Sequence, residues 1–187
     1  MIPGVILDPT TSFASDIASP GPNVDSLAGK RVGFRVDMLW RSWDWTSEVW
    51  AEFLRAEGAE VSFWRSMGRT AEEGARMDAE MNAFFDSIDV AIVGLGNCGS
   101  CTSWTIHDAL AAASCDIPTV AVCTAQFEDL GRALAKRGGR SGLRFHILPY
   151  PLDILPRDEI HGIARDHYRS LLRNLGVRDG LAQQSAA

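Results

Sequence analysis

The 187-residue sequence contains no run of about 18 uninterrupted apolar residues, which is the length that a membrane span requires. Its start, Met1-Ile2-Pro3-Gly4, lacks the basic region and apolar stretch of a secretory leader. Cysteine is scarce too, because the chain has only four, all between positions 98 and 123, unlike a disulfide-rich secreted domain. We therefore expect a cytoplasmic protein that makes no membrane contact and whose thiols are reduced at rest.

An excess of basic residues is also missing. The chain has 18 Lys and Arg against 24 Asp and Glu, which gives a formal net charge of -6. This balance disfavours broad contact with phosphate backbones, so we expect no nucleic-acid partner. The hydrophobic fraction of 46% is enough for one substantial core.

The composition changes along the chain. Residues 1–30 are rich in Pro, Ser, Thr and Gly and predict an extended N-terminal arm for packing or subunit contact. Residues 31–176 predict a single α/β domain that ends in a helix. The last segment, 177–187, is polar at its end and predicts a frayed tail.

Strand and helix patterns alternate through the predicted domain. The expected strands are 31–36, 61–64, 90–95, 118–123 and 143–148, and the expected helices are 46–57, 71–85, 102–114, 127–136 and 158–175. Because parallel strands need crossover helices, this alternation predicts three layers around a parallel sheet. The fold expected is α/β, a flavodoxin-like or Rossmann-like doubly wound sheet of about five strands in the order 2-1-3-4-5.

In that order the loops after strands one and three open a crevice at the carboxyl edge of the sheet. These loops are 37–45 and 96–101. The first brings Trp40, Trp43 and Trp45, which predict an aromatic wall beside the crevice or, equally well, a subunit interface.

The second loop carries Cys98-Gly99-Ser100-Cys101, between an apolar strand and a helical pattern that begins at Thr102. A helix start favours negative charge, so a thiolate there is stabilised and its pKa falls below the free value of about 8.5. This turn is therefore a candidate for sulfur chemistry.

Three roles fit the thiol pair. Cys-x-x-Cys at a helix start is a thioredoxin-type redox arrangement, in which one thiol attacks and the other resolves the mixed disulfide. A zinc site would need Cys115 and Cys123 as further ligands, although apolar surroundings predict that both are buried and structural. Packing alone is the third role. The glycines at this turn only partly match a dinucleotide fingerprint, which belongs to a first strand.

Several side chains around the turn are candidate neighbours of the thiols. Trp104 lies one turn from Cys101 and either closes the pocket or packs in the core. His107 is rotated away and Asp108 lies about two turns below the thiols, roughly 10 Å, so neither is assigned as a base. The segment around Pro149-Tyr150 ends the fifth strand and is expected to border the site.

Three segments together resemble the UGSC family of selenoproteins and their cysteine homologues, over roughly residues 28 to 155. They are Gly94-Leu95-Gly96-Asn97-Cys98-Gly99-Ser100-Cys101-Thr102-Ser103-Trp104 with His107-Asp108, then Pro118-Thr119-Val120, and Pro149-Tyr150-Pro151. The family is related to the substrate-activating components of glycine, sarcosine, betaine and proline reductases. Its motif begins with selenocysteine or cysteine, which implies that Cys98 attacks and Cys101 resolves or assists.

In those reductases the chalcogen attacks a carbon that bears a nitrogen leaving group, and thiols reduce the adduct. The resemblance therefore implies an external thiol reductant and no other certain cofactor, with zinc on the cysteines as a minor alternative. Sulfur here replaces selenium, and Tyr150-Pro151-Leu152-Asp153 stands where a His-Pro-Leu-Gly type ending is common. Family members often occur as pairs of similar short chains, which implies a homo- or hetero-oligomer.

The prediction is a cysteine-dependent enzyme in which Cys98, assisted by Cys101, attacks an electrophilic carbon of a small polar substrate and cleaves a C–N or C–X bond, as a reductase or a lyase does. The alternatives are a non-catalytic metal-binding or redox-sensing module, and a subunit that completes a partner's active site. The residues expected to bind substrate are Asp37, Trp40, Trp43, Asn97, Gly99, Ser100, Thr102, Trp104, Pro149 and Tyr150.

Overall fold

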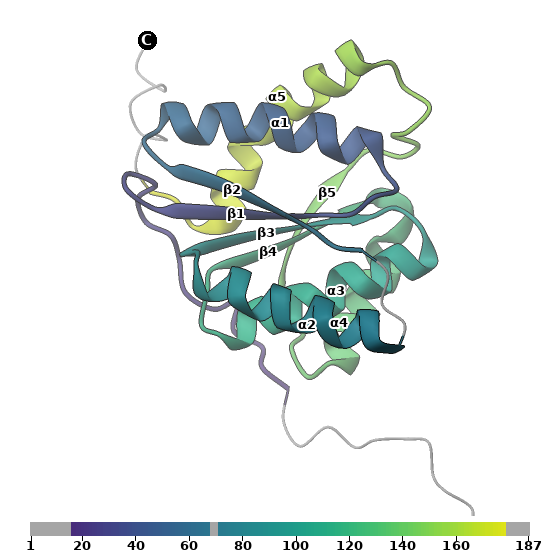
Figure 1. Cartoon of the computed structure of the whole chain (residues 1–187). Coiled ribbons are helices and arrows are strands. Elements are labelled where there is room, and N and C mark those ends of the chain that lie inside the picture. Colours follow the sequence, from purple (N-terminus) through teal and green to yellow (C-terminus); the bar gives the residue numbers. More distant parts are fainter. Residues whose placement is uncertain (1–15, 68–70, 179–187) are drawn as a thin grey trace, which may run out of the picture.

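The computed structural model describes residues 16–67 and 71–178, which contain a five-stranded parallel sheet in the order β2-β1-β3-β4-β5 (Figure 1). The strands are β1 (Arg31–Val36), β2 (Glu60–Arg65), β3 (Val90–Gly96), β4 (Thr119–Thr124) and β5 (Arg144–Leu148). The helices are α1 (Arg41–Ala56), α2 (Ala71–Asp86), α3 (Gly99–Ser114), α4 (Glu128–Arg137) and α5 (Arg157–Leu175), with a short 3-10 turn, η1 (Ala125–Phe127), before α4. The predicted fold class and strand order are confirmed.

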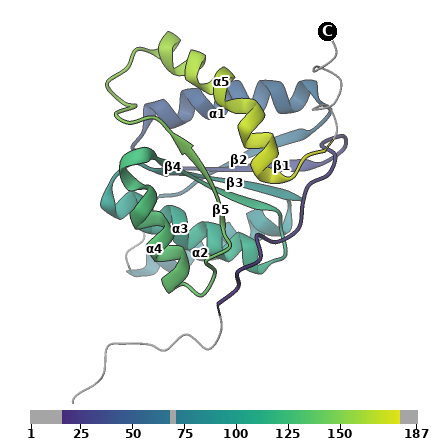
Figure 2. The same ribbon diagram turned by 180° about the vertical axis from the view of Figure 1, so that it is seen from behind.

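The helices cover both faces of the sheet. Helices α1 and α5 lie on one face and α2, α3 and α4 on the other, and the two opposite views agree on this division (Figures 1 and 2). Every residue of β3 and of β4 is buried, as expected for central parallel strands packed on both faces. Each face has its own apolar core, one around Trp43 and Trp50 and the other around Met77 and Phe85.

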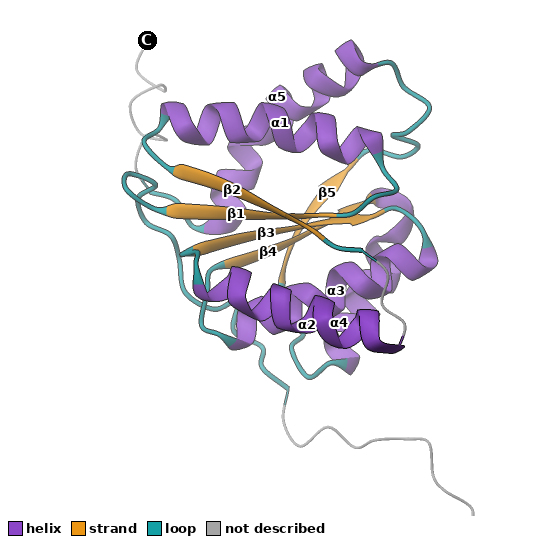
Figure 3. Cartoon of the chain, viewed as in Figure 1, coloured by secondary structure: helices purple, strands orange, loops and turns teal. Residues whose placement is uncertain are grey.

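Two helices, α1 and α3, begin earlier than the sequence predicted, and each follows a strand at the same edge of the sheet (Figure 3). Helix α1 begins at Arg41 instead of Thr46, and α3 begins at Gly99 instead of Thr102. Both starts follow strands that end at the carboxyl edge of the sheet. The loops at this edge are therefore shorter than expected.

The described part of the predicted arm packs against the domain. Val24 donates its amide proton to the Leu175 carbonyl at 3.0 Å, and Asp25 pairs in parallel with Val177. The Arg144 side chain donates to the Pro22 carbonyl at 2.6 Å. Val177, which the prediction placed in the tail, is buried. Residues 1–15 of the arm and 179–187 of the tail lie outside the described residues, and the division of the chain into arm, domain and tail stays a prediction.

A search of the described helices for a membrane span found none that is both long enough and apolar enough.

Two histidines contact each other between β5 and α5, of which His146 is buried and His167 is partly exposed. His146 Nε2 lies 3.2 Å from His167 Nδ1, and the Asn174 side-chain amide lies 3.1 Å from His146 Nδ1. An amide nitrogen donates, so His146 Nδ1 accepts and its proton sits on Nε2, pointing at His167. Burial lowers the pKa of His146 to about 3, with a smaller contribution from His167.

This pair predicts that the protein loses stability as the pH falls below about 6.5, the value of a free histidine. The unfolded chain binds a proton at His146 that the folded chain refuses until the pH nears 3. Between about pH 6.5 and pH 3, His146 therefore lowers the folding equilibrium constant by about tenfold for each pH unit of acidification. Urea unfolding between pH 5 and 7.5 measures how the free energy of unfolding depends on pH. His146→Gln should reduce that slope by the equivalent of about one proton bound on unfolding. His161→Gln is the control and keeps the wild-type slope.

Candidate functional site

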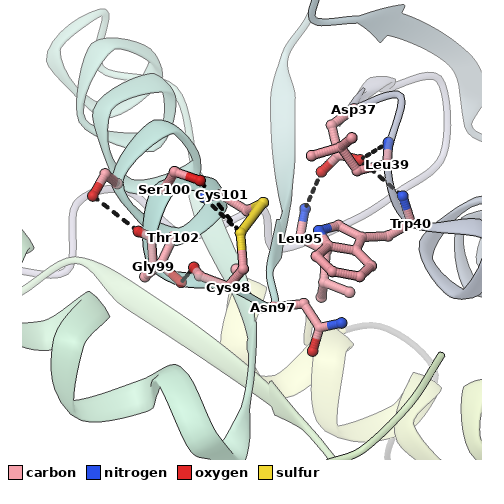
Figure 4. Close-up of a disulfide and its surroundings, with 12 residues drawn as sticks. Asp37, Leu39, Trp40, Leu95, Asn97, Cys98, Gly99, Ser100, Cys101 and Thr102 are labelled. Atoms are coloured by element: carbon pink, nitrogen blue, oxygen red, sulfur yellow. Dashed lines mark hydrogen bonds between the residues drawn. A yellow bond between two sulfur atoms is a disulfide. The ribbon is translucent and has the colours of Figure 1, made fainter. Parts of the chain in front are cut away.

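The two cysteines lie at the first turn of α3 and are joined as a disulfide (Figure 4). Cys98 is the N-cap, and its sulfur accepts the Cys101 amide proton at 3.1 Å. Thr102 fastens the same turn, because its hydroxyl and its amide both donate to the Cys98 carbonyl, at 2.6 and 2.9 Å. The sulfur thus takes the place of the usual Ser or Asp cap. The sequence prediction began this helix at Thr102 because it did not consider cysteine as a cap.

The oxidised pair corrects the expectation that the thiols are reduced. Cys101 is buried, whereas Cys98 is partly exposed and lies within 3.5 Å of the Ser100 hydroxyl. Cys98 is therefore the more solvent-accessible residue of the pair. This asymmetry matches an attacking and a resolving sulfur.

A cavity of about 300 Å³ opens beside Cys101 at the carboxyl edge of β1 and β3. Its lining residues are Arg35, Asp37, Met38, Leu39, Ser66, Met67, Ser100, Cys101 and Trp104. Four of these were predicted as site residues, namely Asp37, Ser100, Cys101 and Trp104. The size suits a small molecule rather than a macromolecule.

Of the five lining residues that were not predicted as site residues, Arg35 is the charged one. Its guanidinium is buried, with Nε 2.8 Å from Asp108 Oδ2 and Nη1 2.8 Å from the Gly94 carbonyl. Asp37 Oδ2 lies 3.7 Å from Nη1. The signal was present in the sequence, because Arg35 interrupts the apolar run 32–36 that leads into the crevice.

Asp108 is fully buried and shares its charge between two partners. One oxygen takes the Arg35 contact, and the other lies 3.1 Å from His107 Nδ1. Buried charges need such pairing, since leaving water costs several kcal/mol for each ion. Asp108 therefore holds Arg35 in place at the cavity.

Asp37 is mostly engaged with the backbone. Its Oδ1 accepts the amide protons of Leu39 at 2.8 Å and Trp40 at 3.2 Å, and Oδ2 accepts that of Leu95 at 3.5 Å (Figure 4). These contacts hold the turn between β1 and α1 against the end of β3. Asp37 lines the cavity, but its oxygens are already used as acceptors.

The predicted aromatic wall is wrong. Trp43 lies within α1 and is fully buried, and its indole N–H donates to the Arg35 carbonyl at 3.2 Å. A Cβ on Gly94 would come within 2.6 Å of the Trp43 ring, so glycine is needed there. Trp40 is the N-cap of α1, and Trp45 packs partly buried against the same core. Of the tryptophans, Trp104 is the one that lines the cavity.

The remaining predicted residues lie around the turn without lining the cavity. Gly99 is exposed at the first position of α3, and Thr102 is fully buried beneath the turn. Asn97 is buried and hydrogen-bonded away from the cavity, to Thr124 and Asp153. Pro149 and Tyr150 follow β5, where the half-exposed Tyr150 ring contacts the edge of Phe127 at 6.1 Å between centroids.

The other two cysteines lie apart from each other. Cys123 is fully buried in β4, and burial raises the pKa of its thiol to about 12. Cys115 is exposed at the C-cap of α3, which corrects the prediction that it is buried. It is separated from Cys98 by the whole 16-residue helix, a length of about 24 Å, so a four-cysteine zinc site is excluded. Among residues 16–67 and 71–178 no group of three or more His, Cys, Asp or Glu is placed to hold a metal ion.

Comparison with known proteins gives one family and a few distant structures. The sequence model of the UGSC family matches residues 5–177. No curated protein matches the chain. The solved NAD(P)H:quinone oxidoreductase from Methanothermobacter marburgensis is 15% identical with a TM-score of 0.49, over 77% of this chain and 100% of that chain. A mutant flavo di-iron protein from Thermotoga maritima is 12% identical with a TM-score of 0.45, over 79% of this chain and 37% of that chain. The family match includes the turn with both sulfurs.

Proposed function

The chain belongs to the UGSC family, and from this premise we propose that it is a cysteine-dependent enzyme acting on a small polar molecule. Cys98 is the nucleophile that attacks an electrophilic carbon and cleaves a C–N or C–X bond. Cys101 assists as the second thiol. The observation that carries the proposal is the disulfide at the first turn of α3, in which Cys101 lines a cavity of small-molecule size and Cys98, which does not line it, is the more exposed partner.

The helix start favours the charged form of the nucleophile. Backbone N–H groups of the first turn point at Cys98, and one of them already donates to its sulfur. In the reduced protein the same contacts stabilise a thiolate, which is the reactive form of cysteine. Arg35 and Asp37 supply fixed charges in the cavity, where they orient a polar substrate.

A reductive cleavage balances with the two thiols alone. The Cys98 thiolate donates an electron pair to carbon, the C–N bond breaks, and the nitrogen leaves with the bonding pair and takes a proton. Cys101 then attacks the Cys98 sulfur, the S–S bond forms, and the carbon leaves with the C–S pair and takes the second proton. The substrate gains two electrons and two protons, and the dithiol becomes the disulfide seen in the structure. An external thiol returns the disulfide to the dithiol.

The deciding experiment traps the first adduct. In Cys101→Ser the thioether on Cys98 has no resolving thiol, so mass spectrometry of the reduced protein with candidate substrates should show a stable addition at Cys98. Wild type should instead form one disulfide for each C–N bond cleaved, whereas elimination would leave the dithiol unchanged. Turnover that survives in Cys98→Ser would refute the proposal.

A second function is favoured by the disulfide itself. A redox-sensing module would cycle between dithiol and disulfide without converting a small molecule. The adduct experiment separates the two, because a sensor gives no addition to Cys98 while still exchanging with glutathione. We also propose that the chain forms an oligomer with itself or with a similar chain. The same assay tests this when it is repeated with the similar chain added, since a subunit that completes a partner's site is active only in the mixed complex.

A further inference from the structure

A network of hydrogen bonds that reaches the reactive turn from the loop after β5 is not used by the chemistry above. Asn97, the residue before Cys98, donates from Nδ2 to Asp153 Oδ2 at 2.6 Å and accepts at Oδ1 from the Thr124 hydroxyl at 2.9 Å. Asp153 Oδ1 also accepts the amide proton of Ser42 at 3.3 Å. The end of β3, the end of β4, the loop after β5 and the start of α1 are therefore linked through the side chains of Asn97 and Asp153.

The orientation of the Asn97 amide follows from its partners. An ionised carboxylate only accepts, so the nitrogen of the amide must face Asp153 and the oxygen must face Thr124. Asn97 and Thr124 are buried, and hydrogen bonds to a charged group are shorter and stronger than neutral ones. Ser42 is the second residue of α1, where free N–H groups favour a carboxylate. The start of α1 thus orients Asp153, and Asp153 orients Asn97 at the end of β3.

We infer that Asp153 is a positioning residue for the Cys98 sulfur and acts through Asn97. Cys98 follows Asn97 in extended conformation, with φ of -152° and ψ of 172°, and its side chain must reach back over the first turn of α3. The direction of that side chain depends on how firmly the preceding residue is held. Asp37, which lines the cavity, accepts the Leu95 amide proton at the same end of β3. The carboxylates of Asp37 and Asp153 therefore both hold the turn.

The inference rests on the proposed role of Cys98, and two measurements on the full chain keep the two ideas apart. The first is the equilibrium between the Cys98–Cys101 dithiol and its disulfide in glutathione buffers. The second is the rate at which iodoacetamide labels reduced Cys98, located by mass spectrometry, with exposed Cys115 as the internal reference. If wild-type Cys98 reacts no faster than Cys115, the proposed function fails. The dithiol–disulfide equilibrium constant still tests the role of Asp153 in that case.

Asp153→Ala should lower the equilibrium constant for disulfide formation by about tenfold, because Asn97 loses its hydrogen bond to a charged group and no longer holds Cys98 in the direction that the disulfide needs. It should also slow labelling of Cys98. Loss of a negative charge alone would speed labelling of Cys98, because it favours the thiolate, and it would lower the disulfide equilibrium constant as positioning does. The sign of the change in labelling rate therefore separates positioning from electrostatics.

Two further variants test the route through Asn97. Asp153→Asn should recover most of the wild-type values, because the Asn97 amide can rotate to accept from the new amide while Thr124 turns its proton toward the Gly96 carbonyl, now 3.4 Å away. Asn97→Ala should match Asp153→Ala, and the double variant should be no worse than either.

The matched control is Asp158→Ala, which removes a carboxylate that is exposed, as Asp153 also is, but that lies in the first turn of α5 instead of beside Asn97. It should leave both measurements within about twofold, as expected for a surface charge. The inference is overturned by an unchanged equilibrium in Asp153→Ala, by an Asp153→Asn variant as impaired as Asp153→Ala, or by fully additive effects in the double variant.

Discussion

Reduced Cys98 will react with iodoacetamide about tenfold or more faster than Cys115 at pH 7. The two thiols are a matched pair inside one molecule, because they cap opposite ends of the same helix, α3. The N-terminal end carries partial positive charge and stabilises a thiolate, while the C-terminal end carries partial negative charge. A free thiol is only about 3% ionised at pH 7, so full ionisation raises the reactive fraction about thirtyfold, and the lower nucleophilicity of an acidic thiol offsets part of this gain.

The measurement is pulsed alkylation of the fully reduced chain across pH 5 to 9, with peptide mapping to separate the sites. Accessibility favours Cys115, which is exposed, over Cys98, which is partly exposed. A faster reaction at Cys98 would therefore reflect its ionisation and not its exposure. Equal rates at the two sites would remove the physical basis for a cysteine nucleophile here.

Asp108→Asn will destabilise the protein by about 3 kcal/mol, at the lower end of the cost of breaking a buried ion pair. The Arg35 guanidinium is buried and loses its partner at 2.8 Å, while Asp37, at 3.7 Å, still compensates part of the charge. Urea unfolding at pH 7.5 gives the free energy of unfolding. The same change should loosen Arg35 at the cavity and weaken the binding of any polar substrate there.

The control for Asp108→Asn is Asp89→Asn, which makes the same chemical change in a pair with Arg31 at 2.7 Å on the surface. Its cost should be at most about 1 kcal/mol, because exposed pairs are screened by solvent. The double variant Arg35→Met/Asp108→Leu should recover part of the loss, since it removes both buried charges together. Equal costs for Asp108→Asn and Asp89→Asn would show that burial does not set the strength of the Arg35 pair.

The sequence predicted the architecture because its signals are local. Short β-branched strands bounded by glycine, each followed by a helical pattern, are visible within windows of about 10 to 20 residues. Parallel pairing and the position of the crevice then follow from general rules of chain connection. Most element bounds were within two residues of those observed. The large errors, at the starts of α1 and α3, fell where a tryptophan and a cysteine act as N-caps, since neither is a usual start signal.

The roles of the side chains around the crevice depend on the direction in which each helix or strand points them. Trp43 was placed on the wall because the sequence shows only that it follows a strand, whereas the early start of α1 turns it into the core against Gly94. The predicted pair of thiols needed no such information. Cys98 and Cys101 are three residues apart, so one helical turn brings their sulfurs together.

By itself the sequence determined the doubly wound sheet, the edge at which the site lies and the turn that carries both sulfurs, because these follow from periodicity and short spacing. Only the tertiary structure decided which charges and amides meet there. Arg35 and Asp108 are 73 residues apart, and Asn97 and Asp153 are 56 apart. Such partners are chosen by the packing of different strands and helices and by the cost of burying a polar group alone, and no local pattern records that choice.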